Sequence, residues 1–343
     1  MQNLREPCDV NTLTVGSDRP PCTTEVEGRA AGQQRSLPSY VLITPARNED
    51  AFIEKTIQSM IRQTVPPLKW VIVDDGSIDK TPDIVNRYLT QCPWMDMVQM
   101  PQRRNRSFAA KVHAFNAGYE RVEGLPYEII GNLDADISFD AAYCEFLLRK
   151  FSEDPRLGVA GTVFEEDGYS SARQSFEGEN HVAGGCQLFR RRCFDEIGGF
   201  IANKAGGVDW IAVTTARMMG WTTKAFREKA FFHHRHLGMA ERNTLAAMFS
   251  YGEKDYYLGG HPIWELFRVI YRMSKWPYLL AGLALALGYG WAMVRRINRP
   301  VSGHLMKFHR REQMRKLAVI LKTAATFKRI DNFASIPPSS PPG

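Results

Sequence analysis

Two aspartates separated by one residue follow a short apolar run, and their spacing suits a divalent cation. The run from Glu128 to Leu133 leads into Asp134 and Asp136. If the run is a β-strand that bends after Asp134, both carboxylates turn toward one point beyond the strand's carboxyl end. Hard divalent cations take oxygen ligands and often share them with substrate phosphates. We therefore predict a metal site, with a plain surface turn, where Asp is common, as the alternative.

The segments around this pair alternate between strand-like and helix-like patterns. Apolar runs predict strands at 40–44, 70–73, 97–100 and 128–133, and helical spacing predicts helices at 52–63 and 108–119. A further helix is expected to begin with Thr81 as N-cap and Pro82 in the first helical position. This alternation indicates right-handed βαβ units and an α/β fold with a mainly parallel sheet.

Polar residues follow three of these strands. They are Pro45, Ala46, Arg47 and Glu49 after the first, Asp74 and Asp75 after the second, and Asp134 and Asp136 after the fourth. The carboxyl ends of parallel strands lie along one edge of a sheet, where ligands bind. We therefore expect these three loops to form one site.

The motifs in these loops resemble those of family 2 nucleotide-sugar glycosyltransferases. The matching segments are Thr44–Glu49, Val73–Thr81, Leu133–Asp136, Gly184–Arg191, Ile197–Phe200 and Gly206–Trp210. The last of these lies where the family carries a Glu-Asp base motif, with Val208 in place of the glutamate. The resemblance covers about residues 39–236. It implies the Rossmann-like GT-A fold, a mixed and mainly parallel sheet flanked by helices.

The chemistry of sugar transfer suggests roles for the acidic residues. A nucleoside diphosphate leaves readily only when its developing charge is neutralised, as a divalent ion does. We expect Asp136 to bind Mg²⁺ or Mn²⁺ directly, and Asp134 to contact the ribose or the metal through water. Asp75 and Asp74 would accept hydrogen bonds from the base or the ribose, and Lys111 is a further nucleotide-side candidate.

Asp209 is the predicted general base. It follows Gly206 and Gly207 and precedes a helical run over residues 210–219, a position that presents a carboxylate into a cleft. A helix N-cap, which Asp fills well, is the alternative reading.

Two adjacent histidines and an arginine lie further along the chain. His233, His234 and Arg235 are expected either to contact the diphosphate or to complete the metal shell, and His234 is our nucleotide-side candidate. The resemblance implies that this region closes over the nucleotide. A solvated strand end is the alternative.

Together these features predict an inverting transferase with a nucleoside-diphosphate sugar as donor. The acceptor would be a hydroxyl or phosphate, on a glycan or a lipid-linked glycan in cell-surface polysaccharide or glycolipid synthesis. A polyprenyl-phosphate sugar synthase is a narrower alternative. Other classes are a metal-dependent nucleotidyl- or phosphoryl-transfer enzyme and a non-catalytic nucleotide-sugar-binding subunit.

The distribution of charge and the cysteine spacing indicate the partners and the cellular compartment of the protein. The chain has 343 residues and a net charge of +7, and residues 295–329 hold eleven Lys and Arg but one acid, Glu312. Such a block suits an anionic membrane surface, and we expect no nucleic-acid partner. None of the six cysteines forms a C-x-x-C pair, which argues against a zinc site. We expect the protein to reside in a reducing cytosol.

The chain divides into four predicted parts: a disordered tail (1–37), a GT-A catalytic domain (38–238), a helical membrane-associated region (239–335) and a second tail (336–343). Residues 277–294 carry no charge and have aromatic and basic flanks. We predict that this segment lies in the membrane plane or re-enters, with an amphipathic surface helix at 304–322. The catalytic domain would then lie at the cytoplasmic face of a membrane, the inner membrane in a bacterium.

Overall fold

The computed structural model describes residues 36–102, 108–167, 169–171, 178–203, 206–235 and 244–326. The predicted tail 336–343, and all but the last two residues of the predicted tail 1–37, lie outside these ranges.

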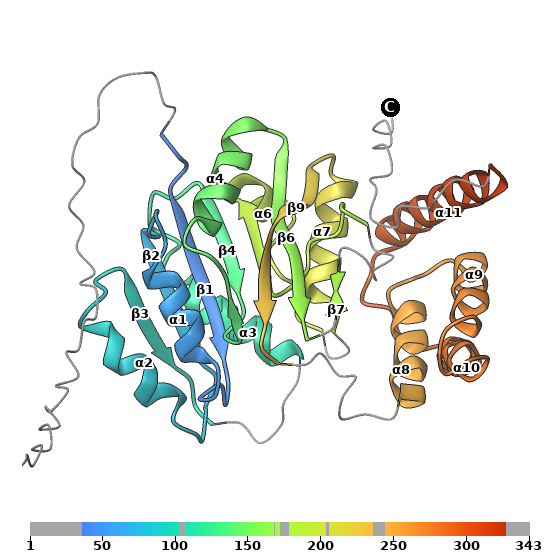
Figure 1. The fold of residues 1–343 in the computed structure, drawn as a ribbon, viewed down its shortest axis with the longest axis horizontal. Helices are drawn as coiled ribbons and strands as arrows, with labels where there is room; N and C mark the ends of the chain where they lie inside the picture. The colour runs from blue at the N-terminus through green and yellow to red at the C-terminus, as the bar shows by residue number, and fades with distance from the viewer. Residues whose placement is uncertain are drawn as a thin grey trace, which may run out of the picture.

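One mixed sheet organises the amino-terminal two thirds of the described chain (Figure 1). Its nine described strands are β1 (Tyr40–Ala46), β2 (Lys69–Asp74), β3 (Met95–Gln99), β4 (Ile129–Leu133), β5 (Ile137–Ser138), β6 (Leu157–Glu166), β7 (Tyr169–Ser170), β8 (Cys186–Arg190) and β9 (Thr222–His233). Their order is β3-β2-β1-β4-β8-β6-β9-β5, with β7 paired to β6.

The strand directions confirm the predicted sheet. Strands β3, β2, β1 and β4 are mutually parallel, and β6 is parallel to β9. Strand β8 runs antiparallel between β4 and β6, so these two blocks point the same way. The carboxyl ends of β1, β2 and β4 therefore lie along one edge, as predicted.

Helices cover both faces of the sheet because side chains of the central strands alternate. In β1, Tyr40 and Leu42 are buried in one core, and Val41 and Ile43 in the other. The first core includes α1 (Ile53–Ile61), α2 (Thr81–Leu89) and α4 (Tyr143–Glu153). The second includes α3 (Phe108–Tyr119), α6 (Arg191–Glu196) and α7 (Val208–Met218).

The described part of the chain ends in four helices outside the sheet (Figure 1): α8 (Thr244–Tyr257), α9 (Pro262–Met273), α10 (Leu280–Val294) and α11 (Gly303–Ala325). The uncharged segment 277–294 and the predicted surface helix 304–322 thus correspond to α10 and α11. Within the described residues, no helix combines the length and apolar character needed to cross a membrane. Helix α11 is joined to α7 by Arg217, whose Nε lies 2.8 Å from Glu312 Oε1.

Helices α8 and α10 approach each other closely at two glycines. A Cβ on Gly252 would lie 2.1 Å from the Leu285 carbonyl oxygen, and one on Gly288 would lie 2.0 Å from the Phe249 carbonyl oxygen. Because both obstacles are backbone atoms, a side chain at either position forces the helices apart. Gly290, on the same helix, has no atom near its Cβ position.

Gly288→Val should therefore destabilise the protein, by about 1–3 kcal/mol as overpacked sites do. Gly290→Ala is the matched control, and should leave stability unchanged or raise it by up to about 1 kcal/mol through helix propensity. Thermal and urea unfolding measure both. Equal stability of the two variants would contradict the close packing of α8 on α10.

A buried carboxyl group lies between α8 and α9. Glu265 is 4% exposed, and its Oε2 lies 3.6 Å from Arg268 Nη1, which also contacts Asp255. Burial raises the pKa of Glu265 to about 8, with the neighbouring Asp255 charge adding to this and Arg268 opposing it. The protonated form of Glu265 is thus favoured in the folded state.

This raised pKa predicts a pH-dependent stability. Because the folded pKa of about 8 exceeds the ordinary 4.5, the stabilisation is complete below pH 4.5 and is lost as pH rises to about 8. The loss should amount to a few kcal/mol in order of magnitude. Glu265→Gln should flatten this part of the stability profile in urea unfolding, whereas Glu253→Gln on α8 should not. A wild-type profile that rises over this range would refute the assignment.

Candidate active site

The bend after β4 brings the two aspartates to the carboxyl edge of the sheet. The Asp134 amide donates to the Gly185 carbonyl at 2.8 Å, which ties the end of β4 to the segment before β8. On the other side, the Thr56 hydroxyl on α1 bonds the carbonyls of Ala135 and Ile137, each at 2.8 Å. The turn that the sequence predicted after Asp134 is therefore braced from both faces.

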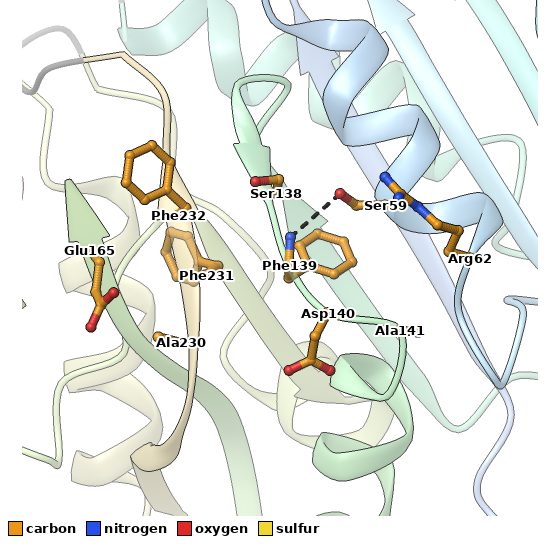
Figure 2. A pocket seen from close by; sticks show the side chains of 10 residues that line it. All are labelled: Ser59, Arg62, Ser138, Phe139, Asp140, Ala141, Glu165, Ala230, Phe231 and Phe232. Atoms are coloured by element: carbon orange, nitrogen blue, oxygen red, sulfur yellow. Dashed lines mark hydrogen bonds between the residues drawn. The ribbon is translucent and has the colours of Figure 1, made fainter. Parts of the chain in front are cut away.

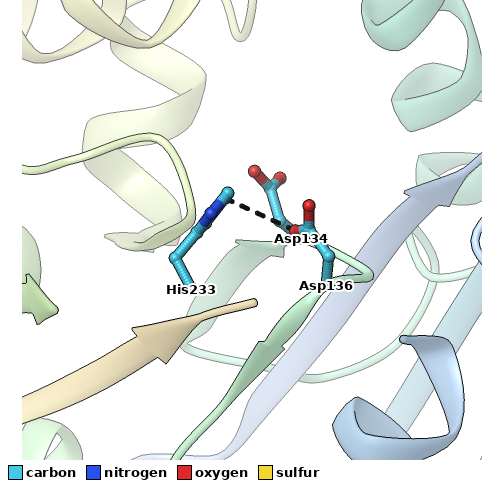
Figure 3. A group of neighbouring side chains, drawn as sticks. All are labelled: Asp134, Asp136 and His233. Carbon is cyan, nitrogen blue, oxygen red and sulfur yellow. Dashed lines mark ion pairs between the residues drawn. The ribbon is translucent and has the colours of Figure 1, made fainter. Parts of the chain in front are cut away.

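His233, the last residue of β9, completes a group suited to a metal ion (Figure 3). One ligand atom from each of Asp134, Asp136 and His233 lies within 4.8 Å of the others. His233 Nε2 is 3.5 Å from Asp136 Oδ1. Two carboxylate oxygens and an imidazole nitrogen form a donor set that Mn²⁺ accepts, and the carboxylates also suit Mg²⁺. The residues present thus fit a divalent cation.

Asp136 is the more enclosed of the two aspartates. It is 8% exposed, and burial, followed by the negative charge of Asp134, raises its pKa above the ordinary value. The neighbouring side chains of His233, Arg235 and Lys111 oppose this rise. Arg235 Nε lies 3.4 Å from Asp136 Oδ2, and its Nη2 also bonds Glu49. Glu49, predicted on the nucleotide side, therefore connects to the metal-site carboxylate through Arg235.

Lys111 reaches the same carboxylates from α3. Its Nζ donates to Asp134 Oδ1 at 2.5 Å. Desolvation lowers the pKa of Lys111, but Asp134, Asp209 and Asp136 together outweigh it and raise that pKa above the ordinary value. The predicted nucleotide-side lysine thus lies among three predicted site aspartates.

Asp209 lies in the first turn of α7, and Gly207 rather than Asp209 holds the N-cap position. Its carboxylate packs against Gly184, where an added Cβ would lie 2.8 Å from Asp209 Oδ2. The Gly184 carbonyl accepts from Asn132 Nδ2 at 2.8 Å, and Asn132 precedes the aspartate pair on β4. Asp209 is therefore held over the chain segment that braces Asp134.

The loops after β1 and β2 interlock through side chains. The Asn48 amide donates to Ser77 Oγ and the Ile78 amide to Asn48 Oδ1, each at 2.9 Å. The Glu49 amide donates to Thr81 Oγ1 at 2.8 Å. The expected N-cap role of Thr81 is wrong, because Lys80 holds that position. The Thr81 hydroxyl instead accepts the hydrogen bond from the loop after β1.

The predicted nucleotide-side residues on these loops have different surroundings. Pro45 and Ala46 end β1, and the Ala46 carbonyl accepts from the Asp75 amide at 2.8 Å. The Asp75 carboxylate is 3.8 Å from Arg47 Nη1. The Asp74 carboxylate accepts from the Ser77 amide at 3.0 Å, which closes the turn after β2.

His234 faces away from the aspartate pair, unlike His233. Its ring stacks on Phe52 at 6.2 Å between centroids, and Nε2 lies 2.9 Å from Ser138 Oγ. Burial, together with the charges of Lys55 and His233, lowers the pKa of His234. The structure therefore separates the two histidines: His233 lies in the group with Asp134 and Asp136, and a nucleotide contact by His234 stays a prediction.

Sequence reasoning missed Glu166 on β6, whose Oε1 is 3.7 Å from His233 Nδ1. It has no motif around it, and only the pairing of β6 with β9 brings it to the site. A cavity of about 490 Å³ lies beside β5, with Ser59, Ser138 and Phe232 among the residues that line it (Figure 2). None of the predicted site residues lines it.

The fold is of the GT-A type. The structure is similar to a mannosyltransferase from Pyrobaculum calidifontis solved with GDP-Man and Mn²⁺, with a TM-score of 0.50 at 22% identity, covering 84% of this chain and 80% of that one. At this identity the likeness shows the fold.

The family model described as "Glycosyl transferase family 2" matches residues 41–175. The predicted resemblance is confirmed: residues 41–175 match the family 2 glycosyltransferase model. It is 27% identical over 133 residues to the putative glycosyltransferase EpsH of Bacillus subtilis, which covers 38% of this chain and 36% of that one. The chondroitin synthase of Pasteurella multocida is also 27% identical, over 37% of this chain and 12% of the synthase. The chain thus matches only about a third of EpsH and less of the synthase.

The cluster predicts a measurable metal affinity. Asp136→Asn should lower Mn²⁺ affinity by at least about tenfold, because a charged ligand becomes neutral in an enclosed site. Isothermal titration calorimetry checks this without any turnover. Asp140→Asn is the matched control, since Asp140 lies four residues along and pairs with Lys229 instead. Equal Mn²⁺ affinity in the two variants would refute the cluster as a metal site.

Proposed function

We propose that this protein is an inverting glycosyltransferase that moves a sugar from a nucleoside diphosphate to an acceptor hydroxyl. The observation that carries the proposal is the convergence of Asp134, Asp136 and His233 with Asp209 at the carboxyl edge of one sheet. The family match over residues 41–175 supports sugar transfer rather than nucleotidyl or phosphoryl transfer.

The donor would bind across the interlocked loops. Asp75, held near Arg47, would accept hydrogen bonds from the base or ribose, and Lys111 would attract the diphosphate. Asp134, Asp136 and His233 would hold a divalent cation, which when bound supplies charge neutralisation for the departing diphosphate. Similar structures are described with GDP-Man and Mn²⁺ and with UDP-GlcNAc, so either nucleotide is a reasonable first donor to test.

Asp209 would act as general base on the acceptor side. Its carboxylate would take the proton of the acceptor hydroxyl while that oxygen forms a bond to the anomeric carbon. The bond from this carbon to the diphosphate oxygen breaks on the opposite face, so the configuration inverts. One carboxylate is sufficient for this single displacement.

The acceptor is proposed to be a growing glycan, including a lipid-linked one. Support comes from the polysaccharide synthases among the relatives, such as the chondroitin synthase. A lipid phosphate acceptor is the narrower version, and both can be offered to the enzyme in the same assay.

Asp209→Asn should lower turnover by about two to four orders of magnitude while donor binding persists, because only the proton acceptor is removed. The assay combines UDP-, GDP- and TDP-sugars with Mg²⁺ or Mn²⁺ and glycan or lipid acceptors, with donor affinity measured by thermal shift. Asp195→Asn, an exposed aspartate on α6, is the matched control. A product that retains the anomeric configuration would overturn the mechanism, and activity confined to simple phosphate esters would overturn the reaction class.

A further inference from the structure

Helix α10 has one buried and one exposed face, and both are apolar. Ala281, Leu285, Gly288, Tyr289 and Ala292 are buried. The opposite face is apolar yet exposed, at Leu280 (53%), Leu283 (47%), Leu287 (65%), Trp291 (47%) and Val294 (76%). Leucines exposed in an unbroken helical row form a patch of the kind that marks an interaction site.

Helix α9 carries a second exposed apolar row. Ile263, Leu266 and Ile270 recur at helical spacing and are 52%, 58% and 60% exposed. The helix packs on α10 through Gly282, where an added Cβ would lie 2.6 Å from the Val269 carbonyl oxygen. In Figure 1 these two helices lie, with α11, at the end of the described structure that is away from β1–β4.

The packing determines how α10 can meet a bilayer. Its buried face contacts the α8 backbone at Gly252 and Gly288, so α10 cannot be surrounded by lipid without leaving α8. Only the row from Leu280 to Val294 is available to lipid. A helix held in this way lies along a membrane surface with one face in the acyl boundary.

The positive charge around the exposed rows favours an anionic lipid surface as the partner. Residues 266–311 contain nine Lys and Arg and no Asp or Glu. Lys275, Arg295 and Arg296 are exposed at the two ends of α10. Trp276, Tyr278 and Trp291 are exposed beside them, as aromatic residues at a headgroup level are. A second copy of the chain would bring the exposed cations Lys275, Arg295 and Arg296 together, whereas anionic headgroups neutralise them.

We propose that the exposed faces of α9 and α10 dock on an anionic lipid surface, with α10 in the plane of the membrane. This binding depends on leucine insertion and on headgroup charge, and on neither sugar nor metal.

Docking in this orientation would also connect the membrane-bound helices with the proposed catalytic base, Asp209. This consequence rests on the proposed function. Leu258, next to the end of α8, lies against Gly207, where an added Cβ would be 3.1 Å from its Cδ2. Gly207 is the N-cap of α7, which carries Asp209. The end of α8, the helix on which α10 packs, therefore lies against the start of α7, so a lipid-linked acceptor would meet Asp209 near the membrane surface.

Co-sedimentation of the full chain with vesicles tests the docking face. Vesicles of phosphatidylcholine alone or mixed with phosphatidylglycerol are used at low and high salt, without sugar nucleotide. We expect binding to the anionic vesicles that weakens with salt. The double substitution Leu283→Glu and Leu287→Glu should lower the partition by about tenfold or more, since two inserted leucines are lost.

Leu68→Glu is the matched control, because Leu68 is 48% exposed just before β2, outside the C-terminal helices. Circular dichroism and the thermal midpoint show that each variant folds. Wild-type protein that stays in the supernatant with every vesicle, or a double variant that binds as wild type does, overturns the proposal. A dimer in light scattering that the double variant abolishes would assign the face to a second copy instead. Because no step uses a donor, these outcomes are independent of whether sugar transfer is found.

Discussion

The repulsion between two aspartates at one sheet edge is the constraint that the site is built around. Asp134 and Asp136 hold negative charges within a few ångströms, which costs a few kcal/mol in a partly enclosed setting. Lys111, Arg235 and His233 approach from α3, from the chain after β9 and from β9 itself. Two segments that are far apart in the sequence, α3 and the end of β9, thus meet at the same pair of charges. A divalent cation would relieve the same repulsion, which is why the site suits one.

The loops around this pair form a continuous frame. Glu49 bonds Thr81 through its backbone and Arg235 through its side chain, and Arg235 in turn faces Asp136. The loop after β1 is therefore linked both to the loop after β2 and to the metal-type cluster. These contacts connect the loops that are proposed to hold the nucleotide with the carboxylates.

The helix that carries Asp209 is held from two directions. Ala212, Val213 and Ala216 of α7 pack in the core on one sheet face. Trp210 and Ile211 pack instead with Leu258 and Leu305 of the C-terminal part. The ion pair between Arg217 and Glu312 adds a third attachment. The end of α8 and helix α11 therefore support the helix that carries Asp209, and the exposed rows of α9 and α10 are separate from this contact.

Much of the fold could be read from the sequence, because local patterns carry it. Alternating apolar runs and helical spacing placed β1, β2 and β4 and α1 and α3 within a few residues of their observed bounds, and the polar loops after them identified the site edge. Other features are non-local. Which of His233 and His234 faces the aspartates depends on where β9 ends, and Glu166 reaches the site only because β6 pairs with β9. The uncharged, apolar composition of the C-terminal segment 277–294 could be read from the sequence. That one of its faces is buried on α8 through Gly252 and Gly288 was decided by tertiary packing, because both faces of this segment are apolar and its sequence therefore carries no periodic signal of which face packs.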